Sequence, residues 1–390
     1  MPEPTNPSPS TVSAVVACGG TGGHLFPGVA VAEELRARGC RVTLMVSPKD
    51  VDQQAVASIS GMELVTLPAV ALNRGGWISF FYGFAKSYRL AHSLFKRRRP
   101  YIVLAMGGFV SAPPILAGKR FGARTFLHES NSIPGRANRW LARSVDGSFV
   151  YFSKAAERLR AKRVEVTGMP VRPQFLHLLG TAQARQALGL NPSAPLVLIM
   201  GGSQGASKIN ELALSAAPQL RRALPNLQFM HLTGVRDVEK VRASYKAQNI
   251  PALVRAFFDD MGVALAAADV AASRAGASSL AELAARRLPA VLIPYPTAAD
   301  NHQHFNALAL QQCGAARMLQ QATATPESLA KEILDLLRDE VKSSEIRQAL
   351  CPWHVPQASA RIAERILHWN AAEVLASPVG DTKTMPVPTY

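Results

Sequence analysis

The sequence predicts an α/β protein with two doubly wound domains that face each other across a cleft. Short apolar runs rich in β-branched residues alternate with helix-like segments along most of the chain, which is typical of parallel sheets covered by helices. Two of these runs, residues 12–17 and 195–200, lead directly into glycine-rich loops at 18–24 and 200–206. One such loop in each half predicts one Rossmann-like domain in each half.

The individual elements follow from the positions of apolar and turn residues. Strands are predicted where an apolar run is bounded by turn or charged residues, and helices where apolar residues recur every three or four positions. In the first series we expect strands at 12–18, 41–47, 63–67, 101–105, 124–128 and 145–151, and helices at 24–38, 78–98, 111–121 and 134–142. In the second series, beginning near 164, we expect strands at 164–167, 195–200, 227–232, 253–256, 269–272 and 290–293, and helices at 207–223, 237–247, 261–267, 277–286, 301–312, 326–339 and 357–374.

Gly168, Pro170 and Pro173 interrupt this alternation and mark the predicted domain boundary. The last helix is a candidate to pack back on the first domain. The predicted parts of the chain are a flexible tail at 1–11, the first domain at 12–168, the second domain at 169–368 and a flexible tail at 369–390.

The composition indicates a globular protein. Of 390 residues, 48% are hydrophobic and 18% are charged, which suffices for two packed cores. No apolar run approaches the roughly 20 residues that cross a bilayer, and the first residues do not resemble a signal peptide. The four cysteines form no Cys-x-x-Cys pair, so we expect no zinc site, no disulfide framework and a reducing compartment.

Positive charge is concentrated in the first half of the chain. Residues 1–170 hold 22 Lys and Arg against 10 Asp and Glu, a net charge of +12, whereas the remaining residues hold 21 against 17, a net charge of +4. Residues 64–128 contain ten basic residues and no acidic one, with aromatic residues interleaved. Such a block suits an anionic membrane surface. The predicted membrane-docking residues are Trp77, Ile78, Phe80, Phe81, Phe84, Arg97, Arg98 and Arg99.

Two alternative roles for this basic aromatic block stay open at the level of sequence. An aromatic helix face can pack on the sheet of its own domain, so that one face serves the core while Trp77, Ile78 and Phe80 project outward. Net charge also does not distinguish the phosphates of lipid from those of nucleic acid.

The glycine loops exclude two common nucleotide-binding classes. Each loop follows a strand and begins a helix, an arrangement that leaves backbone N–H groups unpaired and favours a phosphate. Leu25 stands where a Gly-x-Gly-x-x-Gly fingerprint needs its third glycine, and the strand at 42–47 ends without a ribose-binding acid, so a nicotinamide cofactor is not expected. Neither loop ends in Gly-Lys-Ser/Thr, which disfavours an NTP-hydrolysing P-loop.

Five clusters of polar residues follow predicted strands. Ligands of doubly wound domains bind at this edge of the sheet. One cluster alone is often only a helix cap or a surface ion pair, but five together indicate a binding site. The clusters lie at 106–111, 128–135, 168–172, 273–282 and 300–303.

In order and wording these motifs resemble the MurG family of bacterial N-acetylglucosaminyltransferases, over residues 12–368. The matching motifs are Gly-Gly-Thr-Gly-Gly-His-x-x-Pro-Gly at 19–28, Gly-Gly-Ser-Gln-Gly-Ala at 201–206, Arg-Ala-Gly-Ala-Ser at 274–278 and Ala-Asp-Asn-His-Gln at 299–303. The resemblance implies the two-domain GT-B glycosyltransferase fold. It implies an inverting transfer of N-acetylglucosamine from UDP-N-acetylglucosamine to the 4-hydroxyl of a lipid-linked muramoyl-pentapeptide in peptidoglycan biosynthesis, with no cofactor and no bound metal.

The resemblance also implies the roles of individual residues. Near the donor sugar and diphosphate it places Thr21, Gly22 and Gly23. Arg172 and Ser203 would contact the diphosphate, and Asn131 would reach sugar or acceptor hydroxyls. The other implied donor-binding residues are Phe258 for uracil through its backbone, Ala277, Ser278, Ser279, Leu280 and Ala281 for diphosphate and ribose, Glu282 for a ribose hydroxyl and Gln303 for the sugar.

Inversion by one in-line attack needs a general base near the anomeric carbon, and His24 is the first candidate. It begins a helix beside the glycine loop, where the helix dipole favours the neutral imidazole that can accept a proton. Glu129 is the second candidate and His128 a weaker one. A purely structural role for His24, capping or packing the loop, is the alternative.

Two other functions compete with the transferase. A UDP-N-acetylglucosamine 2-epimerase shares the two-domain architecture but gives no reason for a basic aromatic block. A nonenzymatic membrane- or nucleic-acid-binding module does not need five polar clusters. We therefore predict a transferase at the cytoplasmic face of the inner membrane, peripherally bound. Its expected partners are UDP-N-acetylglucosamine, the lipid-linked muramoyl-pentapeptide and an anionic membrane surface, with no nucleic acid and with other cell-wall synthesis proteins as further candidates.

Overall fold

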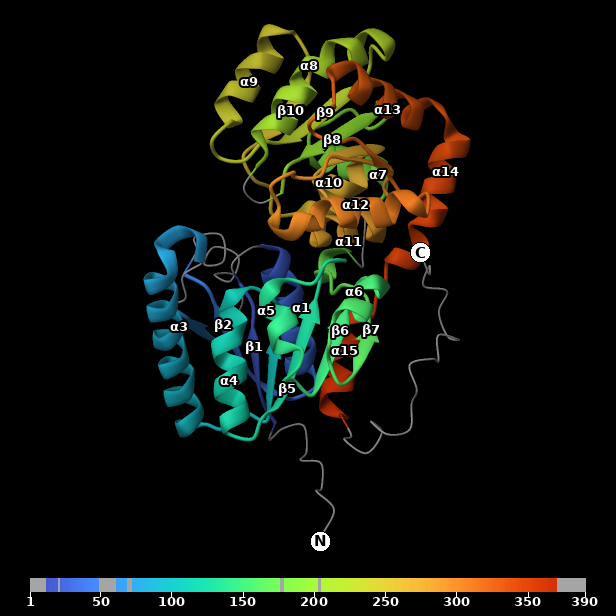
Figure 1. The fold of residues 1–390 in the computed structure, drawn as a ribbon. Helices are drawn as coiled ribbons and strands as arrows, with labels where there is room; N and C mark the ends of the chain where they lie inside the picture. Colours follow the sequence, from blue (N-terminus) through green and yellow to red (C-terminus); the bar gives the residue numbers. More distant parts are fainter. Residues whose placement is uncertain are drawn as a thin grey trace. The chain divides into compact units, whose positions relative to one another are not determined.

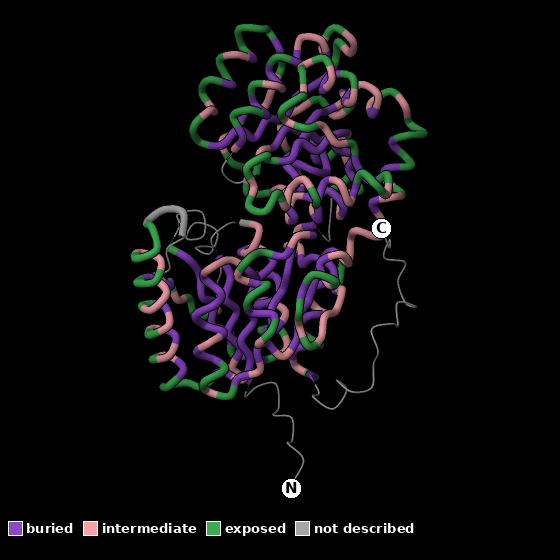
Figure 2. The backbone as a smooth tube through the Cα atoms, viewed as in Figure 1, coloured by how far each residue is buried: buried purple, intermediate pink, exposed green. Residues whose placement is uncertain are grey.

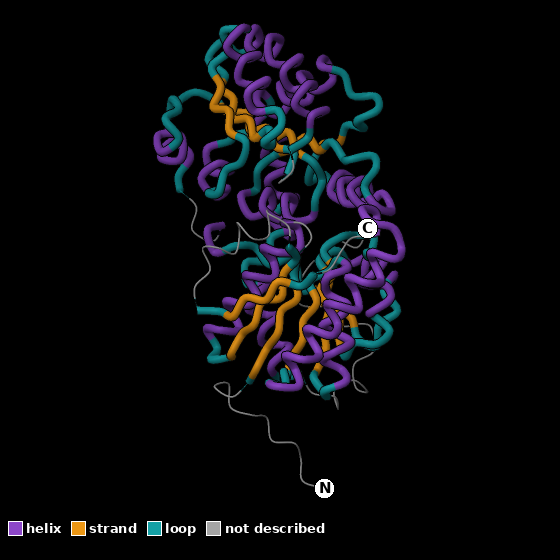
Figure 3. Tube along the Cα trace, turned by 90° about the vertical axis from the view of Figure 1, so that its left-hand side faces the viewer, coloured by secondary structure: helices purple, strands orange, loops and turns teal. Residues whose placement is uncertain are grey.

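The computed structural model describes residues 12–19, 22–48, 61–68, 72–175, 179–202 and 205–369. The chain divides into two compact units. Unit 1 comprises the described residues up to Arg172 together with those from Val355 onward, and unit 2 comprises Pro173–His354. Each unit is a parallel sheet with helices packed on both faces, which confirms the predicted α/β class (Figures 1 and 3).

Unit 1 has seven parallel strands within its described residues, in the order β3-β2-β1-β4-β5-β6-β7. The strands are β1 Ser13–Ala17, β2 Arg41–Val46, β3 Glu63–Thr66, β4 Ile102–Ala105, β5 Arg124–Glu129, β6 Gly147–Val150 and β7 Val164–Val166. The helices are α1 Gly22–Ala37, α3 Leu72–Arg97, α4 Ala112–Arg120, α5 Arg136–Leu141, α6 Ser153–Arg158 and α15 Ala358–Leu367, with a 3₁₀ turn at Phe109–Ser111. The strand order reverses at β1, where Ala17 pairs with Met45 on β2 and with Ala105 on β4.

Successive residues of these strands face opposite sides of the sheet and so build two layers of core. Val16 and Leu104 belong to the same buried cluster as residues of α1 and α15, and Trp369 after α15 completes that cluster. On the opposite face α4 lies so close to β4 that a Cβ on Gly118 would be 2.6 Å from Val103. Figure 2 shows the strands of this sheet buried between the two layers of helices.

Unit 2 has six parallel strands within its described residues, in the order β10-β9-β8-β11-β12-β13, so the order reverses at β8. The strands are β8 Leu196–Met200, β9 Gln228–Leu232, β10 Ala252–Arg255, β11 Val270–Ser273, β12 Ala290–Leu292 and β13 Arg317–Met318. The helices are α7 Thr181–Ala187, α8 Ser207–Ala223, α9 Val238–Ala247, α10 Met261–Ala267, α11 Ala277–Arg286, α12 His302–Gln312, α13 Pro326–Arg338 and α14 Glu340–Ala349, with 3₁₀ turns at Pro173–Phe175, Ala299–Asn301 and Cys351–Trp353.

Most predicted elements are present with small shifts at their ends, and the larger differences have physical causes. The strand at 164–167 was expected to begin the second series, although the predicted first domain, 12–168, contains it; it is β7 and pairs with β6 of unit 1. The helix predicted from 78 begins at Leu72, with a break in the helical backbone at Gly76, where φ is 69°. The helix predicted over 357–374 is α15 and ends at Leu367. Four elements were not predicted from the sequence: α6, α7, α14 and the two-residue β13.

Candidate functional site

The predicted site residues of each unit follow the carboxyl ends of its strands. In unit 1 the loop at 18–24 joins β1 to α1, and in unit 2 the loop at 200–206 joins β8 to α8. β1 and β8 are also the strands at which the strand order reverses. Doubly wound folds bind their ligands at this switch point, because neighbouring connections leave on opposite faces and open a crevice. Each glycine loop therefore occupies the expected ligand position of its own sheet.

His24 lies in the first turn of α1 and packs against the loop that follows β4. A Cβ on Gly107 would lie 2.9 Å from both Cε1 and Nδ1 of His24, so only glycine permits this approach to the imidazole. Gly107 also has a φ of 107°, which disfavours a side chain. Gly22 and Gly23 are the first residues of α1, and Thr21 lies outside the described residues. The loop contact holds the half-buried His24 at the edge of the sheet.

Arg172 and the segment before it are held against unit 1. The guanidinium carbon of Arg172 lies 4.3 Å from the ring centroid of Phe26, a cation–π contact that keeps this side chain beside the N-terminal part of α1, which also carries His24. Nε2 of His128 lies 3.1 Å from the carbonyl oxygen of Gly168. Burial lowers the pKa of His128 to about 4, so the neutral ring donates from Nε2–H. Because His128 is fully buried, it cannot reach a substrate hydroxyl.

The Glu129 carboxylate organises the loop that follows β5. Oε1 accepts from the backbone N–H of Asn131 at 2.8 Å and from its side-chain amide at 3.3 Å. Oε2 accepts from the N–H of Gly135 and from Nδ2 of Asn138, both at 2.9 Å. Burial raises the pKa of the Glu129 carboxyl, and these hydrogen bonds oppose that shift. Both oxygens are therefore engaged in holding the loop that carries Asn131.

The unit 2 glycine loop lies directly against the turn that follows β9. Gly205 has a φ of 71°, and a Cβ there would lie 2.2 Å from the carbonyl oxygen of Thr233. A Cβ on Gly201 would lie 2.5 Å from the nitrogen of Ala206, so the loop is also tightly folded on itself. Ser203 lies outside the described residues.

Helices α8 and α11 both begin at this edge without a side-chain cap. Their N-cap residues are Ala206 and Gly276, whereas at α13 Thr325 accepts a hydrogen bond from the N–H of Ser328. Uncapped N–H groups and the helix dipole together favour a phosphate at such a terminus. Of the predicted ligand residues in α11, Ala277, Leu280 and Ala281 are buried, and Ser278, Ser279 and Glu282 are half-buried.

Gln303 is oriented by the end of β12. Its Oε1 accepts a hydrogen bond from the backbone N–H of Tyr295 at 3.0 Å, which leaves the amide NH₂ as the group to present to a ligand. The buried Arg274 donates to the carbonyls of residues 293 and 294, at 3.0 and 3.2 Å, and so fixes the segment that carries Tyr295. Phe258 follows β10 at the same edge and is half-buried. This role of Arg274 was not predicted from the sequence, because its hydrogen-bond partners lie far along the chain.

Residues along much of α3 are exposed or half-buried (Figure 2). Trp77, Ile78 and Phe81 are 66%, 88% and 59% exposed. Phe80 and Phe84 are half-buried, so the expectation that Phe80 projects outward with Trp77 and Ile78 is wrong in part. The aromatic face does not form the core contact of this helix.

Helix α3 packs against α4. Its buried residues recur every four positions and so lie on one face of the helix: Gly83, Ser87, Ala91 and Phe95. At the end of the helix Arg97, Arg98 and Arg99 are exposed, and Arg98 pairs with Glu63 at 2.9 Å.

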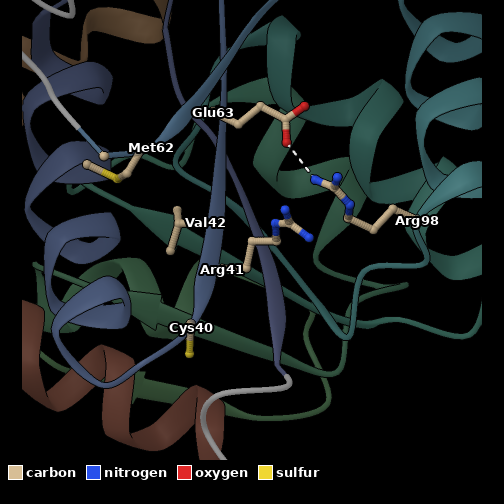
Figure 4. A pocket seen from close by; sticks show the side chains of 7 residues that line it. Cys40, Arg41, Val42, Met62, Glu63 and Arg98 are labelled. Atoms are coloured by element: carbon tan, nitrogen blue, oxygen red, sulfur yellow. Dashed lines mark hydrogen bonds and ion pairs between the residues drawn. The ribbon is translucent and has the colours of Figure 1, made fainter.

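The cavity shown in Figure 4 lies at the opposite edge of the unit 1 sheet, where β2 and β3 begin. It has a volume of about 460 Å³ and opens beside the ion pair between Glu63 and Arg98. None of the predicted donor-binding residues lines it, so we do not assign the substrate to it. The lining residues are Cys40, Arg41, Val42, Gly61, Met62, Glu63 and Arg98.

The described part of the chain holds neither a membrane-spanning helix nor a cluster of metal ligands. None of its helices combines the length and apolar character needed to cross a bilayer. No three His, Cys, Asp or Glu side chains there are grouped so that they could hold a metal ion.

Comparison with known proteins identifies the family. The glycosyltransferase family 28 N-terminal domain matches residues 14–150, and its C-terminal domain matches 196–364. Proteins named UDP-N-acetylglucosamine–N-acetylmuramyl-(pentapeptide) pyrophosphoryl-undecaprenol N-acetylglucosamine transferase are similar over most of their length. The one from Rhodospirillum rubrum is 38% identical, covering 90% of both chains, and the one from Geobacter sp. (strain M21) is 35% identical, covering 86% of this chain and 90% of its own.

Solved structures agree with this relationship. The crystal structure of MurG from Acinetobacter baumannii is 27% identical with a TM-score of 0.70, and covers 91% of this chain and 98% of its own. A UDP-N-acetylglucosamine 2-epimerase from Listeria monocytogenes, 15% identical with a TM-score of 0.68, shares the fold alone. The chain has the GT-B fold and belongs to the UDP-N-acetylglucosamine–N-acetylmuramyl-(pentapeptide) pyrophosphoryl-undecaprenol N-acetylglucosamine transferases, within glycosyltransferase family 28.

Proposed function

We propose that this chain transfers N-acetylglucosamine from UDP-N-acetylglucosamine to lipid I and so forms lipid II of peptidoglycan. The 4-hydroxyl oxygen of the acceptor bonds to the anomeric carbon, the bond from that carbon to the diphosphate breaks, and the hydroxyl proton passes to a base. The observation that carries this proposal is that the motifs shared with the family follow the carboxyl ends of the strands in both sheets, with a glycine loop at each switch point.

His24 is the base in this proposal. It is only half-buried and lies in the first turn of α1, within the glycine motif. Glu129 is less suitable, because both of its oxygens accept hydrogen bonds from its own loop. A general base needs a lone pair directed at the proton it removes. Glu129 instead positions Asn131, which we assign to sugar or acceptor hydroxyls.

The leaving diphosphate is stabilised by fixed donors and one guanidinium. The uncapped N-termini of α8 and α11 present backbone N–H groups, and Arg172 offers a planar pair of donors for phosphate oxygens. Such donors stabilise charge on the leaving group without reorganising as it forms. We also assign four further residues to the donor sugar and diphosphate: Thr21, Gly22, Gly23 and Ser203.

Unit 2 binds the rest of the donor. The backbone at Phe258 takes the uracil, and residues 277–281 take the diphosphate and ribose through the first turns of α11. Glu282, half-buried on the same helix, accepts from a ribose hydroxyl. Gln303 donates from its amide NH₂ to the sugar, because its oxygen is held by Tyr295.

The exposed end of α3 is the proposed membrane-docking surface. Trp77, Ile78 and Phe81 would enter the interfacial region of the bilayer, with Phe80 and Phe84 beneath them. The exposed Arg97–Arg99 run at the other end of the helix adds attraction to anionic lipid. This surface would place the enzyme peripherally at the cytoplasmic face of the inner membrane.

The activity is tested by transfer of labelled N-acetylglucosamine to a soluble lipid I analogue. His24→Gln should lower kcat by about 100-fold or more, and Arg172→Ala should lower kcat/KM for the donor. Exposed residues of the same types, His368→Gln and Arg222→Ala, serve as matched controls and should be unaffected. A folded wild-type protein that transfers no sugar would overturn the proposed function.

The docking surface is tested by cosedimentation with phosphatidylglycerol vesicles. The triple variant Trp77→Ser, Ile78→Ser and Phe81→Ser should lose vesicle binding and keep its kcat toward the soluble acceptor. Val341→Ser, an equally apolar and 69% exposed position on α14, is the control. Undiminished binding by the triple variant would exclude α3 as the docking surface.

A further inference from the structure

A buried series of hydrogen bonds lies behind the unit 2 glycine loop. His231 on β9 is fully buried, with Nδ1 3.1 Å from the hydroxyl of Tyr245 on α9 and Nε2 3.0 Å from Oδ1 of Asn210 on α8. Nδ2 of Asn210 in turn donates to the carbonyl of Thr233 at 3.0 Å and to Oδ2 of Asp237 at 2.8 Å. The series therefore joins β9, both neighbouring helices and the turn at 233–237.

The donor and acceptor of every hydrogen bond in the series are fixed by the two groups at its end, the Thr233 carbonyl and the Asp237 carboxylate. The Thr233 carbonyl and the Asp237 carboxylate can only accept, so Asn210 must turn its NH₂ toward them and its Oδ1 toward His231. His231 then donates from Nε2–H and accepts at Nδ1 from the Tyr245 hydroxyl. Burial lowers the pKa of His231 to about 3 and raises the pKa of Tyr245, so both keep the protonation states that this arrangement needs. The series is satisfied in one orientation only.

The series ends on backbone shared by two parts of the proposed donor site. The Thr233 carbonyl that accepts from it is the atom against which Gly205 packs. The N–H groups of Thr233 and Gly234 donate to the carbonyls of residues 255 and 256, at 3.0 and 2.9 Å, just before Phe258. A shift of this turn would therefore move the glycine loop and the uracil segment together.

We propose that His231 and Tyr245 are positioning residues for the donor nucleotide, acting through Asn210 on the turn after β9. The inference rests on the proposed function, since it takes this loop and segment as the UDP site. Both side chains are buried, so they hold the backbone that binds UDP without touching the ligand. Since the Gly205 contact leaves no room for even one added carbon, a small displacement of Thr233 is passed directly to the loop.

Three variants remove the series in steps. Tyr245→Phe removes only the hydroxyl and nearly preserves the volume of the side chain. His231→Leu removes both ring nitrogens and leaves Asn210 without its donor. His231→Gln restores an N–H group near the position of Nε2 and is the conservative rescue. The matched control is Leu336→Ala, a buried position on α13 of the same unit that takes no part in the series.

The readouts are the UDP dissociation constant by calorimetry and the separate KM values for donor and acceptor. We expect His231→Leu to raise the UDP Kd and the donor KM about tenfold and to leave the acceptor KM unchanged. Tyr245→Phe should raise the UDP Kd and the donor KM about threefold. His231→Gln should recover most of the loss. Leu336→Ala should lower Tm with the UDP Kd unchanged.

The inference is overturned if folded Tyr245→Phe and His231→Leu lose stability but keep donor KM and UDP Kd within twofold of wild type. It is also overturned if Leu336→Ala shifts the UDP Kd as much as they do, since the effect is then one of general loosening. A wild-type protein that binds UDP without transferring sugar refutes the proposed reaction alone, because the UDP titrations of the variants still decide the role of His231.

Discussion

Replacing Glu129 by Gln separates a positioning role from a role as general base. The change converts one of two accepting oxygens into an NH₂ group that faces donors. If Oε2 is the atom replaced, the N–H of Gly135 and Nδ2 of Asn138, both now at 2.9 Å, lose their acceptor. Each buried donor left without a partner costs about 1–3 kcal/mol, so the ordered loop is destabilised by about 2–6 kcal/mol. Even the lower value corresponds to a roughly 30-fold lower kcat if the ordered loop is needed for transfer.

The assay is steady-state transfer to the soluble acceptor across a pH series. Glu129→Gln should lower kcat while the acid limb of the profile stays in place, because the proposed base, His24, is unchanged. Asn138→Ala removes one of the same hydrogen bonds and should lower kcat in the same direction by a smaller factor. The reasoning is refuted if Glu129→Gln abolishes the acid limb and Asn138→Ala leaves kcat unchanged, since Glu129 would then be the base.

Three further predictions concern stability. Gly28→Ala should destabilise unit 1 by about 1–3 kcal/mol, measured in urea, because the added carbon would lie 2.5 Å from Cβ of Cys18; an unchanged midpoint would show that α1 can shift freely. Arg185→Met should cost about 2–3 kcal/mol in thermal unfolding, because the buried guanidinium lies 2.6 Å from the partly exposed Asp269; a neutral result would show that packing compensates. The pKa of His128 is lowered from 6.5 to about 4 in the folded state, so the unfolded chain binds a proton at this residue first as the pH falls. The free energy of unfolding of unit 1 should therefore be unaffected by this group above about pH 6.5 and should fall by about 2 kcal/mol between pH 7 and pH 5. A urea midpoint for unit 1 that is as pH-dependent in His128→Gln as in wild type would contradict this assignment.

The fold was predictable where local patterns decide it. The central strand β8 of unit 2 consists entirely of large apolar residues, and β4 of unit 1 has the sequence Ile-Val-Leu-Ala, as expected for buried parallel strands. β7 was assigned to the wrong series because chain order does not reveal sheet membership, and its half-buried Val-Glu-Val sequence indicates only an edge strand. α14 was missed because only Ser343 and Ile346 of its ten residues are buried, too few to produce a helical period.

The candidate site was predictable in part, for a similar reason. Residues such as His24 and Gln303 stand next to glycine or strand-end signals, so local sequence indicates where they lie. For the side chains that hold such residues in place, local sequence does not indicate the hydrogen-bond partners. Arg274 donates to a segment some twenty positions away and to Gln321, and His231 has hydrogen-bond partners on two helices. A buried His or Arg within a strand-like run is the sequence signal of such partners, but the run alone does not name what they bind.

The glycines of the unit 2 loop show why motif identity carries more information about function than the strand–loop–helix pattern alone. At Gly205 the fold requires glycine, because the Thr233 carbonyl occupies the place of a side chain. At Gly202 a Cβ would meet no atom of the described residues within 4 Å, but φ is 84°. Tight turns explain the first glycine without any ligand. The positive φ at the second likewise favours glycine without any ligand, so neither glycine by itself reports a phosphate, and the functional assignment of this loop depends on the whole Gly-Gly-Ser-Gln-Gly-Ala motif.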